Sequence, residues 1–199
     1  MTRTVRRGEA ASPWSPRETE LLEVTLQLLQ EHGYDRLTLD AVAARARASK
    51  ATVYRRWPSK AELVLAAFIE GVRQIAVHPQ TGTLRGDLVQ LGEACREQAA
   101  AQAGTIRAVL VETSRHPALN EALRDQFLVQ RKALMHDILR DAVERGDIDA
   151  GVISDELWDV LPGYLIFRII MPSRPPTFET VKTLVDEVII PSLTRKANG

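Results

Sequence analysis

Residues 36–60 read RLTLDAVAARARASKATVYRRWPSK, and this stretch decides the fold. It contains two short apolar patterns with a helical period, and a hydroxyl residue that can cap a helix precedes each: Thr38 before 39–46, and Ser49 before 50–57. Only residues 47–49 separate the two patterns, and two short helices joined by so tight a turn must cross at a steep angle. The stretch therefore predicts a helix-turn-helix.

The 3.6-residue period of a helix separates an inner and an outer face on both predicted helices. The inner faces are expected to form a shared core of apolar side chains, made by Leu39, Val42, Val53 and Trp57. The outer face of the second helix is basic and aromatic, and it carries Lys50, Ala51, Tyr54 and Arg55.

Charge is distributed unevenly along a chain whose formal net charge is zero. Within residues 36–60, seven Lys and Arg stand against a single acid, Asp40, so this window carries a net charge of +6. A basic window that keeps a helical period is typical of a nucleic-acid-binding face, although a solvated charged surface is the alternative interpretation.

Helical periodicity continues on both sides of this window, and strand-like alternation is nearly absent, so we expect an all-α fold. Capping-box patterns at Ser15 and Ser59 predict helices over 16–32 and 59–76. Further helices are expected at 83–102, 104–114, 117–145, 154–171 and 178–195. The predicted organisation is a flexible basic arm (1–15), a helix-turn-helix domain with a connecting helix (16–78), and a larger helical domain for ligand binding and dimerisation (79–199).

Composition argues against several classes of protein. With 199 residues, 45% apolar and 26% charged, the chain has the make-up of an ordinary globular protein. Its longest apolar run, Leu63–Ile69, is far shorter than the ~20 residues of a membrane span, and no apolar stretch follows the N-terminal arginines as in a secretory signal. A single cysteine, Cys95, fits a reducing compartment, so a cytoplasmic, nucleoid-associated protein without a membrane partner is expected.

No catalytic or metal-binding constellation is apparent, so we expect neither an enzyme nor a cofactor. The four histidines are scattered and none has metal-ligand spacing with another histidine or with Cys95: His32, His78, His116 and His136. Cys95 lies on an amphipathic pattern, where a buried thiol is more common than a nucleophile.

The segments 37–46, 49–54 and 57–63 together resemble the DNA-binding domain of TetR-family transcriptional regulators, and the resemblance extends over about residues 16–68. The segment AVERGDI (142–148) is similar to one found in many members. The resemblance implies an all-helical homodimer that binds an operator in double-stranded DNA, most often as a repressor of a palindromic site that a small hydrophobic effector releases.

Carried over by position, the resemblance implies base contacts from one side of the second helix and phosphate contacts around it. The resulting set of DNA-binding residues is Thr38, Arg47, Ser49, Lys50, Ala51, Thr52, Tyr54, Arg55 and Lys60. One departure stands out, because family members usually have glycine where this chain has Arg47 at the turn. We expect Arg47 either to adopt a left-handed backbone at a cost of roughly 1 kcal/mol or to reach a phosphate.

The last two helices carry more apolar residues than one packing face requires, and the resemblance implies that they form a four-helix dimer interface. The expected interface residues are Leu157, Tyr164, Val181, Leu184, Val185 and Val188. The candidate effector pocket comprises Phe127, Arg131, Met135, Trp158 and Leu161, which are also candidates for ordinary core. A ligand-independent DNA-binding or architectural dimer is the main alternative, and a small-molecule enzyme is a distant third.

Overall fold

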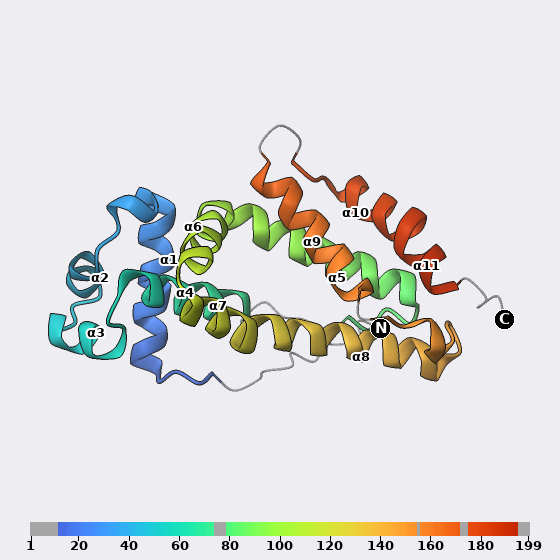
Figure 1. Ribbon diagram of the computed structural model, residues 1–199, viewed down its shortest axis with the longest axis horizontal. Helices are drawn as coiled ribbons and strands as arrows, with labels where there is room; N and C mark the ends of the chain where they lie inside the picture. Colours follow the sequence, from blue (N-terminus) through green and yellow to red (C-terminus); the bar gives the residue numbers. More distant parts are fainter. Residues whose placement is uncertain (1–11, 74–78, 155, 172–174, 195–199) are drawn as a thin grey trace, which may run out of the picture. The chain divides into compact units, whose positions relative to one another are not determined.

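The computed structural model describes residues 12–73, 79–154, 156–171 and 175–194, and in these ranges it is helical, with no strand (Figure 1). The helices are α1 (Pro16–Arg36), α2 (Leu39–Arg45), α3 (Lys50–Arg56), α4 (Lys60–Arg73), α5 (Leu84–Ala101), α6 (Ala103–Arg115), α7 (Pro117–Leu123), α8 (Val129–Arg145), α9 (Leu157–Ile170), α10 (Phe178–Leu184) and α11 (Ile190–Thr194). Single π-helical turns, Arg124–Leu128 and Val185–Ile189, continue α7 into α8 and α10 into α11. The all-α prediction is confirmed, and the helices expected at 117–145 and 178–195 each run through one π turn.

The described residues fall into two compact units whose composition differs from the predicted domains. The N-terminal unit contains residues 12–73 together with 102–129, and the C-terminal unit contains 79–101 together with 130–171 and 175–194. A change of unit does occur near residue 78, but α6 and α7 pack on α1 and α4 instead of joining the C-terminal unit. Residues 74–78, where the end of the connecting helix was expected, lie outside the described residues.

Local capping fixes where the helices of the N-terminal unit begin. Ser15 and Glu18 form a reciprocal capping box at the start of α1, as the sequence predicted. Thr38 and Ser49 accept hydrogen bonds from the main-chain N–H groups of Ala41 and Thr52, which caps α2 and α3. Gly33 takes φ 76°, so the regular part of α1 ends where glycine was expected to end it, and one further turn continues to Arg36.

The core of the helix-turn-helix is the one expected from the periodicity. Val42 and Val53 are completely buried, and Leu39 and Trp57 nearly so. Trp14, just before α1, adds a second indole against Trp57, with ring centroids 5.7 Å apart. The recognition helix α3 is therefore held by apolar packing from its inner side alone, which leaves its outer side open.

The C-terminal unit packs α5, α8, α9 and the α10–α11 segment around one apolar core. Its most deeply buried members are Ile138, Leu161, Leu165, Val181 and Val185. At Gly92 of α5 the helices approach so closely that a Cβ atom would lie 2.6 Å from Val181 Cγ1 and 3.2 Å from Leu161 Cδ1. Glycine is needed here for contact distance, since its neighbours leave no room for a methyl group.

The segment 142–148, which carried part of the resemblance, ties the end of α8 to the start of α5. Arg145 bonds the buried carboxylate of Asp87 at 3.2 Å and Asp147 at 3.0 Å. Asp147 also accepts the main-chain N–H of Leu84, the first residue of α5. Gly146 between them takes φ 79°, which lets the chain turn directly after the helix. The segment is therefore a structural brace.

Candidate nucleic-acid interface

The turn between α2 and α3 is a Schellman motif built around Arg47. The N–H of Ala48 donates to the carbonyl of Ala43 at 2.8 Å, and the N–H of Arg47 donates to that of Ala44 at 3.2 Å. Arg47 itself has φ 50°, and among the described residues it is the one non-glycine with positive φ. The left-handed backbone expected at this departure from the family pattern is therefore present, and it leaves the side chain exposed beside α3.

The outer side of α3 matches the predicted face. Lys50, Ala51, Tyr54 and Arg55 are all exposed, whereas Val53 on the same helix is buried. Thr52 is half-buried, and its hydroxyl lies 2.7 Å from that of Ser49. A capped helix with one buried face and one basic face is what entry into a major groove requires.

Two of the predicted contact residues share a partner that the sequence analysis did not include among the site residues. The carboxylate of Asp40, in the first turn of α2, accepts a hydrogen bond from Lys50 Nζ at 2.6 Å and another from the Tyr54 hydroxyl at 3.3 Å. The bond to Lys50 is the main reason that the pKa of Asp40 lies below its usual value, and Asp40 in turn raises the pKa of Lys50. The signal for Asp40 was its position as the one acid in the basic window.

Lys60 is placed differently from the rest of the predicted set. Its Nζ donates to the carbonyl of Tyr34 at 3.0 Å and lies 4.3 Å from the centre of the Tyr34 ring. Lys60 thus satisfies a main-chain carbonyl at the C-terminal end of α1 and is half-buried. A phosphate contact from this ammonium remains a prediction, and it would be made by a group that already holds α1 to α4.

Arg56 is a further cation at the end of α3 that the sequence analysis left out. It bonds Glu18 of α1 at 2.6 Å, and its guanidinium lies 4.5 Å from the centre of the Trp14 ring. Glu18 therefore serves both the cap of α1 and the anchoring of α3, and the cap is the main reason that its pKa is lowered. Arg56 holds the recognition helix, whereas Arg55 beside it faces outward.

The structure corrects half of the predicted dimer interface. Val181, Leu184 and Val185 are buried in the core of their own C-terminal unit, so they cannot also form the surface of an interface. The exposed large apolar side chains on α9, α10 and their continuations are Tyr164, Phe167, Met171, Phe178 and Val188. Leu157 is half-buried. Helices that are apolar all round offer two possible stripes, and the period alone favoured the wrong one on α10.

The five candidate pocket residues do not gather around one cavity in the described part of the chain. Met135 and Leu161 are closed core, and Arg131 Nη2 lies 3.1 Å from Cys95 Sγ, which is largely buried. Phe127 belongs to the other unit, where its ring packs on Phe68 at 5.2 Å. The side chain of Trp158 lies outside the described residues.

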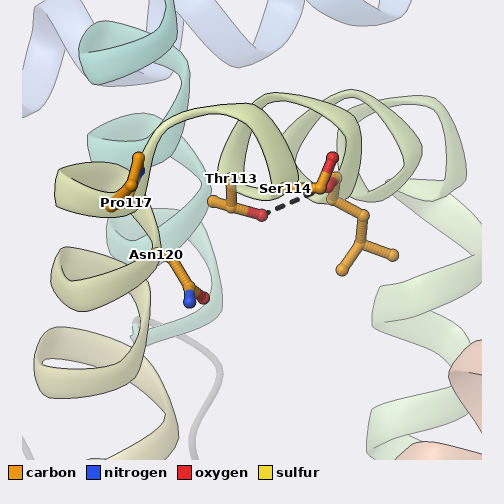
Figure 2. A pocket seen from close by; sticks show the side chains of 5 residues that line it. Thr113, Ser114, Pro117 and Asn120 are labelled. Atoms are coloured by element: carbon orange, nitrogen blue, oxygen red, sulfur yellow. Dashed lines mark hydrogen bonds between the residues drawn. The ribbon is translucent and has the colours of Figure 1, made fainter.

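A surface hollow of about 340 Å³ lies instead at the α6–α7 corner of the N-terminal unit (Figure 2). Its lining is Leu110, Thr113, Ser114, Pro117 and Asn120, and it contains none of the candidate pocket residues. The hydroxyls of Thr113 and Ser114 are already bonded to main-chain carbonyls of α6. The hollow thus has little free polar chemistry to offer a ligand.

Two further searches bear on function. Among the described residues there is no group of three or more His, Cys, Asp or Glu side chains that could hold a metal ion. Within the same ranges no helix has the length and apolarity to span a membrane.

The fold and this exposed basic face define a helix-turn-helix DNA-binding regulator. Two family models match the chain: "Bacterial regulatory proteins, tetR family" over residues 21–67, and "Tetracyclin repressor-like, C-terminal domain" over residues 78–188. The chain belongs to the TetR family, as the sequence resemblance predicted. It is accordingly a transcription regulator and not an enzyme, which confirms that expectation.

Comparisons along the whole chain agree with this conclusion. The HTH-type transcriptional regulator Rv1556 of Mycobacterium tuberculosis is 69% identical over 98% of this chain and 96% of its own length. The DNA-binding transcriptional repressor TetR of Mycobacteroides abscessus is 34% identical over 94% of this chain and 95% of its own length. Among solved structures, the TetR-family regulator SCO0332 is similar with a TM-score of 0.73 and 28% identity, covering 88% of this chain and 97% of that one.

Proposed function

We propose that this regulator is a cytoplasmic repressor that binds a two-fold symmetric operator as a homodimer and is released by a small hydrophobic effector. The observation that carries the proposal is the outer face of α3, where four exposed residues, two of them cationic, stand on a helix fixed by caps and a buried core. The 34% identical relative that is described as a DNA-binding transcriptional repressor supports the sign of regulation.

Base reading falls to the residues of α3 that have suitable donors and reach. Lys50 and Arg55 present the ammonium and guanidinium donors that pair with guanine edges, and Thr52 offers a methyl group and a hydroxyl. Ala51 is small enough to let the helix lie close to the bases. Positioning on phosphates falls to the exposed or capping groups around them, namely Thr38, Arg47, Ser49, Tyr54 and Lys60.

Two-fold symmetry follows from the exposed apolar face of α9 and α10. Tyr164, Phe167 and Met171 recur at three and four residues, which places them along one side of α9. A surface of this kind is normally covered in a protein that lives in water, and TetR-family regulators form dimers. In an isologous pair the two α3 helices bind half-sites one helical turn, or a multiple of it, apart.

Effector release is the part of the proposal that separates a sensor from a ligand-independent DNA-binding dimer. The C-terminal unit offers one half-buried guanidinium, Arg131, beside the apolar core that contains Met135 and Leu161. We place the effector near these side chains, with the apolar part of the ligand against the core and any acidic group on Arg131.

Selection from a randomised duplex library by the purified full-length chain tests the DNA-binding part. We expect enrichment of an inverted repeat whose half-site centres lie about 10 base pairs, or a multiple, apart. Enrichment of single half-sites without symmetry would contradict a two-fold complex, and no enrichment at all would contradict sequence-specific binding.

A thermal-shift screen of small hydrophobic compounds, followed by calorimetry with and without the selected operator, tests the effector part. Linkage requires that operator weakens effector binding by the same factor as effector weakens operator binding, typically 5- to 150-fold. A compound that binds free and operator-bound protein equally well would not be an inducer. If every compound that binds behaves in this way, the ligand-independent alternative is correct.

A further inference from the structure

Asp40 is an acid in the middle of a surface that is otherwise built to meet a polyanion. Residues 36–60 carry seven Lys and Arg and this single carboxylate, which lies on α2, the helix before the recognition helix. Lys50 and Tyr54 are one helical turn apart on α3, so both project from the same side and both reach Asp40. A carboxylate at this place repels DNA phosphates, and it therefore calls for a physical reason.

Stability does not supply that reason. The side chains of Lys50 and Asp40 are 68% and 48% exposed, and ion pairs at such exposure contribute little to folding because water screens them. Val42, Val53 and Trp57 already hold α2 against α3. The contact with Asp40 therefore matters mainly for what the ammonium of Lys50 is free to do.

We infer that Asp40 is a specificity-determining residue, which neutralises Lys50 on non-specific DNA and releases it only to a base edge that replaces the carboxylate. A phosphate offers Lys50 one anionic acceptor in exchange for another, so leaving Asp40 yields little on an arbitrary sequence. A guanine offers two acceptors, N7 and O6, in the groove that α3 enters, while Asp40 keeps Tyr54 as a partner. This inference rests on the operator recognition proposed above and adds the residue that suppresses binding elsewhere.

The inference has a measurable electrostatic consequence. Each phosphate that a cation neutralises changes the slope of log K against log salt by about −0.9, because counterions are released. With Lys50 paired to Asp40, non-specific binding lacks this contribution. Replacement of Asp40 by an amide frees the ammonium for a phosphate and should make the slope more negative by about 0.9 for each recognition motif on the duplex.

Asp40→Asn is the test, with Glu31→Gln as the matched control. Glu31 pairs with Arg45 at 2.8 Å in the same helix-turn-helix region, at 43% and 51% exposure, but it does not touch α3's contact residues. Affinity is measured by fluorescence anisotropy at several salt concentrations, on an alternating inosine–cytosine duplex and on the operator selected above. We expect D40N to bind the non-specific duplex several-fold more tightly with the steeper slope, and to lose a similar factor of discrimination, while E31Q leaves the slope unchanged.

Two further variants decide whether the effect acts through Lys50. In a Lys50→Gln background, D40N should no longer change the slope, and Asp40→Glu should restore wild-type behaviour in part, since a longer carboxylate still reaches the ammonium. Denaturation midpoints of all variants show whether the motif stays folded.

The inference is overturned if D40N leaves non-specific affinity and its salt slope unchanged, or if the change persists in the K50Q background. It is also overturned if D40N weakens only the selected operator, because Asp40 would then read a base itself. The non-specific arm needs no operator, so a failed selection contradicts the proposed function and not the role of Asp40.

Discussion

At residue 47 an arginine adopts the backbone that glycine adopts at the corresponding place in another helix of the same chain. Arg47 follows α2 with φ 50°, and Gly146 follows α8 with φ 79°; both stand in the same pair of main-chain hydrogen bonds. A side chain costs roughly 1–2 kcal/mol in this conformation, and glycine avoids that cost. The chain therefore retains strain at the turn of its DNA-binding motif, where an exposed cation is useful.

Arg47→Gly is expected to raise the free energy of unfolding by about 0.5–1 kcal/mol, since relief of strain is partly offset by the greater freedom of glycine in the unfolded chain. The same variant should weaken DNA binding and make its salt slope shallower by about 0.9, as expected for one lost phosphate contact. Urea denaturation and anisotropy titrations measure the two effects.

Gly146→Ala is the reverse substitution in the matching motif. A Cβ atom there has open space around it, so any loss of stability reports backbone strain alone, and a loss of about 1 kcal/mol is expected. Equal stability of R47G and wild type, together with a clear loss in G146A, would show that Arg47 gains compensating contacts in the free protein.

Tyr34 gives a pH-dependent signal at the joint between α1, α4 and α6. Burial is the main cause that raises its pKa to about 12, and the neighbouring carboxylate of Glu112, to which its hydroxyl is hydrogen-bonded, adds to the effect. A tyrosine is neutral when protonated, so the unfolded chain loses this proton near pH 10 while the folded chain keeps it until about pH 12. The free energy of unfolding should therefore fall as pH rises through this interval and be unaffected by Tyr34 below it.

Spectrophotometric titration of tyrosinate checks this expectation, because the chain has three tyrosines. Tyr34→Phe should remove the component that titrates at about pH 12. Glu112→Gln should move the component to lower pH without returning it fully to the ordinary value, since burial remains. A component that survives unchanged in Y34F would show that another tyrosine is responsible.

On the scale of whole helices, sequence and structure agree where a cap or a core position is decided by neighbours in the chain. Ser15, Thr38 and Ser49 cap the helices that they were expected to cap, and Val42 meets Val53 as the period required. These features depend on residues three or four apart, which a sequence displays directly.

The features that the sequence could not predict depend on contacts between distant elements. The inner stripe of α10 was misplaced, because the helix is apolar on two sides and only packing on α5 decides which side is buried. The membership of α6 and α7 in the N-terminal unit is likewise a matter of which helices they pack on. The pair of Asp40 and Lys50 joins two helices across ten residues, and its two charges alone do not show that they meet.

Gly92→Ala tests how tightly the helices of the C-terminal unit are packed. The added methyl group would lie 2.6 Å from Val181, whose branched side chain has little freedom to move, so overpacking should cost about 1–3 kcal/mol despite the better helix propensity of alanine. Gly104→Ala is the control, because nothing lies within 4 Å of its Cβ position on α6. We expect that variant to be as stable as wild type or slightly more stable in thermal denaturation, and a stable G92A would contradict the close approach.

For the whole molecule, the distinction between core and surface on the last helices decides which substitution separates the subunits. Phe167 is 56% exposed on α9, whereas Val185 is completely buried in its own unit. Phe167→Glu places a charge on the exposed apolar face, where a monomer tolerates it and a dimer interface does not. Val185→Glu buries an unpaired charge, which should unfold the C-terminal unit at any protein concentration.

Sedimentation and circular dichroism together distinguish the two outcomes. We expect F167E to sediment as a folded monomer at micromolar concentration, with unchanged helical content and a loss of operator affinity, because a single motif binds one half-site. V185E should instead lose helical signal and aggregate, and its failure to dimerise would say nothing about the interface. A wild-type protein that sediments as a monomer, or an F167E variant that remains dimeric, would place the subunit contact elsewhere. In the second case, charges introduced one at a time at Tyr164, Met171, Phe178 and Val188 would show whether any of this exposed face is used.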